Sequence, residues 1–142
     1  MIEGVIITPL KRISHEKGDI FHAMKQSEES FISFGEAYFS NIHFGKVKGW
    51  KKHSKMVLNL VVPVGSVRFV LFDDRQGSIT NGEYFDLVVS SDNYIRLTIP
   101  KGIWMAFQGI GDHQNLLLNI ASIEHDPLES TTEPLTYIPF EW

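Results

Sequence analysis

The sequence predicts an all-β protein, built as a sandwich or barrel of antiparallel strands. Short runs rich in Val, Ile, Phe and Tyr recur along its 142 residues. Turns containing Gly, Pro, Asn or Asp separate these runs at intervals of about 8–12 residues, which is typical of such folds. The alternation of strands and helices that marks a βαβ fold is missing. We therefore expect one domain over residues 1–142, with little helix and a core that needs no metal or disulfide.

The first third of the chain predicts short strands followed by one long aromatic strand. Gly4–Thr8 is a β-branched run that ends at a proline, and the turn Gly18-Asp19 precedes a second short run, Ile20-Phe21. Ser33–Phe44 is rich in Phe, Tyr and Ile, which suits a long strand.

The central stretch, Gly45–Arg75, begins with a cluster of cations and continues into two apolar runs. Met56–Val62 is the first run, and Ser66–Phe72 follows it after the turn Pro63–Gly65. Two β-rich runs joined by a short Pro/Gly turn predict an antiparallel hairpin. The cations would then form a polar mouth at the entrance of the first strand, where binding or chemistry could occur.

The last half predicts further short strands and a docked tail. Asn-Gly and other turn signals separate four runs, namely Tyr84–Ser90, Tyr94–Ile99, Ile103–Gln108 and Asn115–Ile123. The chain ends in the aromatic segment Leu135–Trp142. Because loose tails are normally polar, we expect this segment to pack against the body of the protein.

Composition excludes several classes of function. The chain has no cysteine, which removes disulfides, thiolate metal sites and a cysteine nucleophile. Its net charge of -4 argues against a nucleic-acid partner. It shows neither a signal peptide nor an apolar run that could cross a membrane, so we expect a cytoplasmic protein. Five lysines run against the net charge and leave a small anionic ligand open: Lys46, Lys48, Lys51, Lys52 and Lys55.

Several motifs occur in an order that is similar to a known family. The chain carries V-K-G-W at Val47–Trp50, P-V-G-S-V-R-F-V-L-F-D-D-R at Pro63–Arg75, I-P-K-G-I-W-M-A-F at Ile99–Phe107 and I-P-F-E-W at its end. Together they resemble the dTDP-4-dehydrorhamnose 3,5-epimerase family of cupin jelly rolls. The resemblance implies a double-stranded β-helix (jelly roll), a homodimer, a nucleotide-linked deoxysugar as ligand and a reaction without a cofactor.

The resemblance also implies a catalytic dyad, which this chain does not preserve. The family's histidine base removes a proton next to a ketone, a tyrosine returns one to the opposite face, and cations hold the enolate oxygen. Lys51 occupies the position of that base, and the segment Gln114–Asn119 holds no tyrosine where the family has one. His53 lies two residues after Lys51, on the same face of a strand but ~6–7 Å further along it.

We therefore expect His53 to act as the base and Lys51 to stabilise the oxyanion. An ordinary histidine has a pKa of about 6.5, near neutral, whereas an ordinary lysine has a pKa of about 10.4. Trp104 and Phe107 are expected in the barrel wall, where a ring at the mouth could stack on a nucleobase or sugar. The full set expected to bind substrate is Lys48, Trp50, Lys55, Asn59, Arg68, Trp104, Phe107 and Asn119.

A cupin-type metal site is not expected. Metal cupins take three histidines from H-x-H and P-x-G-x-x-H motifs, since the metal needs convergent imidazoles. The corresponding segments here read Lys51-Lys52-His53 and Pro100-Lys101-Gly102-Ile103-Trp104-Met105, which supply one histidine.

Three functions remain open at this stage. The first is a nucleotide-sugar epimerase or isomerase that acts on a 4-keto-deoxysugar nucleotide in surface-polysaccharide biosynthesis. The second is a relative that binds a sugar nucleotide without catalysis, which the altered dyad favours. The third is a dimerisation module, for which we expect side chains to plug the mouth of the barrel.

Overall fold

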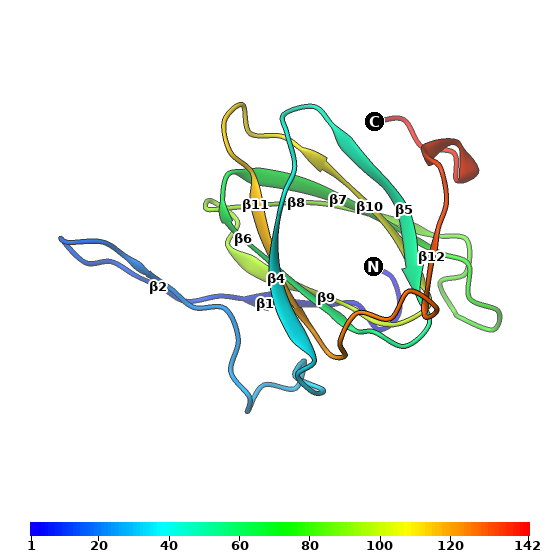
Figure 1. Ribbon diagram of the computed structural model, residues 1–142, viewed down its shortest axis with the longest axis horizontal. Coiled ribbons are helices and arrows are strands. Elements are labelled where there is room, and N and C mark those ends of the chain that lie inside the picture. Colours follow the sequence, from blue (N-terminus) through cyan, green and yellow to red (C-terminus); the bar gives the residue numbers. More distant parts are fainter.

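The computed structural model describes all 142 residues and shows two antiparallel sheets that face each other (Figure 1). The first sheet has the order β1 (Ile6–Pro9), β9 (Ile95–Ile99), β6 (Leu58–Val64), β11 (Leu116–Ala121) and β4 (Glu36–Asn41). The second has the order β12 (Ser130–Thr132), β5 (Val47–His53), β10 (Ile103–Gly109), β7 (Ser66–Asp73) and β8 (Tyr84–Ser90). The all-β jelly roll that the sequence predicts is confirmed.

The core lies between the two sheets and follows the alternation of side chains along each strand. Val67, Phe69 and Leu71 of β7 point inward and are fully buried, together with Leu60 of β6 and Leu97 of β9. Each such side chain contributes roughly 1.5–3 kcal/mol when it leaves water. Successive strand residues face opposite sides, so these inward residues hold the two sheets together.

The predicted hairpin between Met56–Val62 and Ser66–Phe72 is wrong. β6 pairs with β9 and β11 in the first sheet, whereas β7 pairs with β10 and β8 in the second. Gly65 makes the crossing with φ of 82°, and a Cβ there would lie 2.2 Å from the carbonyl oxygen of Gln114. A short Pro/Gly turn fits a corner between two sheets as well as a hairpin, and the turn signal alone does not distinguish them.

The C-terminal tail packs on the outer face of the second sheet, as its aromatic composition predicts. Ile138 is buried in a second apolar cluster with Trp50 and Trp104, and Phe140 and Trp142 pack against it. A 3-10 turn, η1 (Leu135–Tyr137), lies in this tail. The tail thus covers the outer face of β5 and β10 while the inner face remains available for a site.

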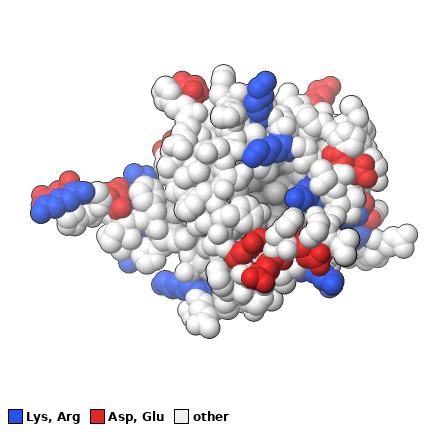
Figure 2. Space-filling model, in the orientation of Figure 1, with Lys and Arg blue, Asp and Glu red and all other residues white.

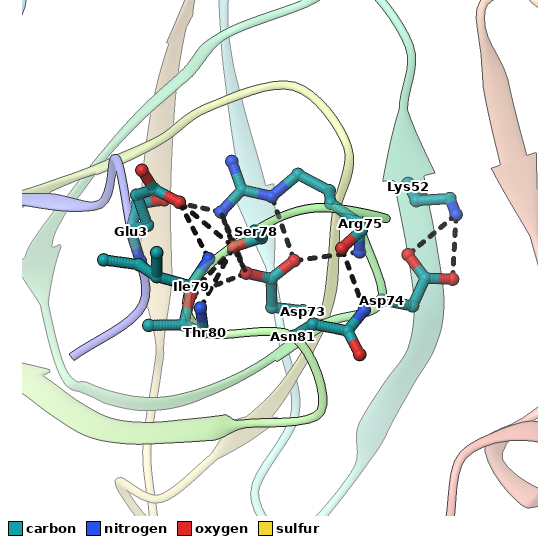
Figure 3. A network of polar contacts seen from close by, with 9 residues as sticks. All are labelled: Glu3, Lys52, Asp73, Asp74, Arg75, Ser78, Ile79, Thr80 and Asn81. Carbon is teal, nitrogen blue, oxygen red and sulfur yellow. Dashed lines mark hydrogen bonds and ion pairs between the residues drawn. The ribbon is translucent and has the colours of Figure 1, made fainter.

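A polar network joins the N-terminal end to the turn after β7 (Figure 3). The buried Asp73 carboxylate accepts hydrogen bonds from Arg75, Ser78 and Thr80. Arg75 also donates to the main-chain carbonyl of Glu3 (2.7 Å). This network fixes the first residues of the chain against the second sheet.

A two-stranded arm extends away from the two sheets (Figure 1). It consists of β2 (Arg12–Ile13) and β3 (Ile20–Phe21). Phe21 meets Tyr94 edge to face at the base of the arm, while Ile20 remains exposed.

Candidate active site

A cavity of about 350 Å³ opens between the two sheets. Figure 2 shows a hollow in this face of the molecule, with Lys or Arg side chains at its edge. The apolar part of its wall consists of Leu58, Leu60, Met105, Phe107 and Leu117. The side chains that could bind or transfer protons are Tyr38, Ser40, Lys48, Lys51, His53, Asn119 and Thr132. An apolar cavity with a few convergent polar groups is the usual form of a small-molecule site.

A β-bulge in β5 brings the two lysines of the cavity onto one face. Lys51 pairs with Met105 and Lys48 pairs with Phe107, so one residue of β10 opposes two residues of β5. Without the bulge, residues three apart would face opposite sides of the sheet. Because of the bulge, the same face of β5 presents three polar side chains to the cavity: Lys48, Lys51 and His53.

His53 is held by a buried carboxylate. Its Nδ1 atom contacts Glu129 Oε1, and the side chains are 10% and 1% exposed respectively. The other carboxylate oxygen accepts the main-chain N–H groups of Lys55 (3.1 Å) and Met56 (3.2 Å).

The charge of Glu129 fixes the proton on His53. Burial alone would raise the pKa of Glu129, but the hydrogen bonds from His53 and the two N–H groups outweigh burial and lower it. An ionised carboxylate can only accept, so Nδ1 of His53 carries the proton. In a neutral imidazole with its proton on Nδ1, the Nε2 atom carries the lone pair that a general base requires.

The lysines give the cavity a positive potential. Lys48 Nζ donates to Ser40 Oγ (3.0 Å) and to the carbonyl oxygen of Asn41 (2.7 Å), which are both neutral acceptors. No aspartate or glutamate lines the cavity. The uncompensated charges of Lys48 and Lys51 therefore favour an anionic ligand or a developing oxyanion.

The structure brings together five of the residues singled out in the sequence. Lys48, Lys51, His53, Phe107 and Asn119 line the same cavity.

The other five lie elsewhere. Trp50 and Trp104 are buried under the C-terminal tail, because they point to the outer face of the second sheet. Arg68 pairs with Asp86 on the same outer face. Asn59 is buried and accepts from Thr98, while Lys55 is exposed after the end of β5.

Sequence reasoning missed Tyr38 and Glu129. Tyr38 lies in a predicted strand, but nothing in the sequence shows that β4 pairs with β11 at the mouth of the cavity. Glu129 lies in an acidic, proline-containing segment that looks like a solvated loop. The sequence feature that could have pointed to Glu129 is the adjoining run Ser130–Thr132, which forms β12 and pairs with β5.

No three His, Asp or Glu side chains converge in an arrangement that could hold a metal ion. The chain also has no helix that is long and apolar enough to cross a membrane.

The jelly roll thus carries, in one cavity, a histidine oriented by a buried carboxylate and two lysines without a carboxylate partner. No protein-family model matches the sequence. A solved structure of a dTDP sugar isomerase from Desulfovibrio desulfuricans G20 is 37% identical, with a TM-score of 0.95, covering 99% of this chain and 92% of that one. The chain therefore belongs to the family of dTDP-sugar isomerases and 3,5-epimerases, as its motifs predict.

Two curated relatives are similar over nearly their whole length. The spore coat polysaccharide biosynthesis protein SpsL of Bacillus subtilis (strain 168) is 26% identical, covering 100% of this chain and 97% of the relative. The probable low-salt glycan biosynthesis epimerase Agl13 of Haloferax volcanii is also 26% identical, over 96% of this chain and 88% of the relative.

Proposed function

We propose that this protein is a cofactor-independent epimerase of a 4-keto-deoxysugar nucleotide in surface-polysaccharide biosynthesis. The observation that carries the proposal is His53, held by buried Glu129 and facing a cavity with two lysines and no lining carboxylate. The names of the relatives support it, since they include a dTDP sugar isomerase and a polysaccharide biosynthesis protein.

The geometry supports proton transfer next to a ketone. Nε2 of His53 takes the proton from the carbon beside the carbonyl group, and the C–H electrons move to form an enolate. Lys51, from the same strand, stabilises the charge on the enolate oxygen. The imidazolium that results is stabilised by the Glu129 carboxylate, and a proton then returns to the same carbon on its opposite face.

The cavity argues against a dimerisation module without a ligand. A dimerisation module requires a mouth that is plugged by side chains. The cavity between the sheets has a volume of about 350 Å³ and is lined in part by polar side chains. A binding protein without catalysis would have the same cavity, so the test below separates binding from proton transfer.

We also propose that the protein is a cytoplasmic homodimer. β4 is an edge strand of the first sheet, and the arm β2–β3 presents apolar side chains to solvent. A partner subunit is a common cover for such edges.

The function is tested by deuterium uptake from D2O into candidate 4-keto sugar nucleotides. His53→Asn should slow uptake about 10²–10⁴-fold, because it removes the general base. Lys51→Met should slow it about 10²–10³-fold, because it removes a charge from the oxyanion. Both variants should keep a thermal shift with dTDP, since ligand binding to the folded state raises the melting temperature.

Lys101→Met, an exposed lysine in the turn before β10, is the matched control and should behave as wild type. Undiminished uptake in His53→Asn would contradict the base assignment. A thermal shift without uptake by the wild type, across several 4-keto substrates, would indicate a binding protein.

A further inference from the structure

The β-bulge in β5 decides whether Lys48 faces the cavity. Gly49 and Trp50 lie opposite the single residue Ala106 of β10. In a strand without the bulge, residues two apart would share a face, so Gly49 would face the cavity with Lys51 and Lys48 would point to the outer face. A bulge leaves its extra residue without a partner in the ladder. Pairing with β10 therefore does not by itself hold the bulge in place.

The chain that follows β12 supplies the missing contacts beside β5 (Figure 1). The main-chain N–H of Glu133 donates to the carbonyl oxygen of Trp50 (2.9 Å). Pro134 has no N–H, so the pairing with β5 cannot continue beyond it. In the C-terminal tail, the carbonyl oxygen of Leu135 accepts the indole N–H of Trp50 (3.2 Å). Trp50 is thus held through both its main chain and its side chain.

The bulge and the tail fit each other on the side of β5 that faces away from the cavity. The indole of Trp50 is fully buried in the cluster that contains Ile138, and the ring of Trp142 lies 6.1 Å from it. A Cβ at Gly49 would lie 3.3 Å from the carbonyl oxygen of Glu133, closer than an ordinary van der Waals contact. Even a methyl group at this position would therefore push against the chain that leads into the tail.

The part of β5 that follows the bulge is held independently of it. Lys51 pairs with β10 on one side and with β12 on the other. His53 pairs with Ser130 of β12. Lys48 lies before the bulge and pairs with β10 alone. A disturbance of the bulge should therefore move Lys48 and leave Lys51 and His53 in place.

We propose that Trp50 is a positioning residue that keeps Lys48 in the cavity, and that the C-terminal tail holds Trp50 in this role. The inference rests on the proposed function, because it concerns the cation that meets the anionic part of the nucleotide sugar. Lys48 donates to Ser40 and to the carbonyl oxygen of Asn41, both neutral acceptors that a phosphate oxygen can replace. When Trp50 is not held, the bulge relaxes, Gly49 turns toward the cavity and the positive charge of Lys48 leaves it.

A double-mutant cycle on dTDP binding tests the link between Trp50 and Lys48. Lys48→Met should raise the dissociation constant of dTDP about tenfold or more, because it removes a charged hydrogen-bond donor. Trp50→Phe keeps an aromatic ring but removes the indole N–H, and should raise the constant about three- to tenfold. The double variant should bind dTDP as Lys48→Met does, within about twofold, because Trp50 acts only through Lys48.

The same variants separate binding from proton transfer. Trp50→Phe should raise KM for a 4-keto sugar nucleotide by the same factor as the dissociation constant of dTDP. The kcat for deuterium uptake should stay within about threefold of wild type, because His53 and Lys51 keep their places. A general loss of structure would lower kcat as well, so this split distinguishes positioning from stability.

Trp104→Phe is the matched control. Trp104 is also buried under the tail, and its indole N–H donates to Asp74 (2.8 Å), away from the bulge. Its effect on dTDP binding should be additive with that of Lys48→Met. Gly49→Ala is the second variant, since it disturbs the contact with Glu133 while Trp50 remains, and it should weaken dTDP binding in the same direction even if Trp50→Phe does not fold.

Additive effects of Trp50→Phe and Lys48→Met, or a fall in kcat as large as the rise in KM, would overturn the inference while the proposed function stands. Wild-type affinity for dTDP in Gly49→Ala and in Trp50→Phe would also overturn it. A wild type that binds dTDP but takes up no deuterium would overturn the proposed epimerase, and the binding cycle would still decide the role of Trp50. Absence of dTDP binding by the wild type would overturn both.

Discussion

Glu129 decides the chemistry of His53, although it is 76 residues away in the chain. One carboxylate oxygen contacts the imidazole, and the other accepts hydrogen bonds from two main-chain N–H groups just after β5. The side chain therefore has a single orientation, in which its charge fixes both the ring and the tautomer of the histidine.

Glu129→Gln should slow proton abstraction about 10²–10⁴-fold, measured as deuterium uptake and as kcat against pH. The glutamine amide can donate to Nδ1 of His53, which would place the proton on Nε2 and remove the base. Glu129→Asp should recover part of the activity, because it restores the charge.

Glu124→Gln, an exposed glutamate in the same segment, is the control and should leave uptake unchanged. Normal uptake in a folded Glu129→Gln protein would show that the carboxylate only supports the fold.

The end of β7 shows how one buried carboxylate organises an element. Asp73 accepts from Arg75 Nε and Nη2 (both 2.9 Å) and from Ser78 and Thr80 (both 2.7 Å), and its side chain is fully buried. The hydrogen bonds from Arg75 lower the pKa of Asp73 most. Burial acts in the opposite direction, but the bonds from Arg75 and the two hydroxyl groups outweigh it and hold the pKa of Asp73 far below its ordinary value.

This lowered pKa predicts acid sensitivity. A carboxyl group with a lowered pKa in the folded state stabilises the protein fully above its ordinary value of about 3.9, and this contribution is lost as the pH falls below that value. Asp73→Ala should cost about 3–5 kcal/mol at pH 7, because it leaves the partners of the carboxylate unpaired. The free energy of unfolding in urea, measured from pH 7 down to pH 2.5, should fall less steeply in the variant below about pH 4.

Asp86→Ala is the matched control. Asp86 pairs with Arg68 at the surface, where such a pair contributes about 0.2–1 kcal/mol. Equal losses in the two variants would contradict the role given to the buried network.

At the scale of the whole molecule, the apolar surface is unevenly distributed. The C-terminal tail buries its aromatic residues against its own sheet. At the β4 edge of the first sheet an aromatic side chain is exposed instead, since Phe39 is 63% exposed. On the arm, Ile20 is 56% exposed. This contrast is the reason to place a subunit interface at β4 and the arm.

Light scattering should therefore give twice the mass of one chain. Phe39→Lys should shift the protein to a monomer without loss of β structure, because a lysine on an edge strand opposes pairing with another edge. Ile79→Lys, which changes an even more exposed apolar residue in the turn after β7, should remain dimeric. A monomeric wild type at the concentrations used for activity would contradict the proposal.

The sequence by itself determined the strands, the jelly roll and the family. Alternation and turn residues are local signals, so most strand positions were predictable, and the order of motifs such as Val47–Trp50 and Ile99–Phe107 carries the resemblance. It also predicted the packing of Leu135–Trp142, because an aromatic tail has few alternatives to burial. Lys51 could be singled out because the resemblance places the family's base at its position, and His53 because it lies two residues further on the same face of the strand.

Only the tertiary structure decided how these strands meet. The turn at Gly65 is compatible with a hairpin or with a corner, and the contact with Gln114 that makes it a corner is distant in sequence. The bulge that turns Lys48 toward Lys51 depends on pairing with β10. Glu129 and Tyr38 reach the cavity through pairings of β12 with β5 and of β4 with β11. Such pairings join segments far apart in the chain, and no local pattern of residues specifies them.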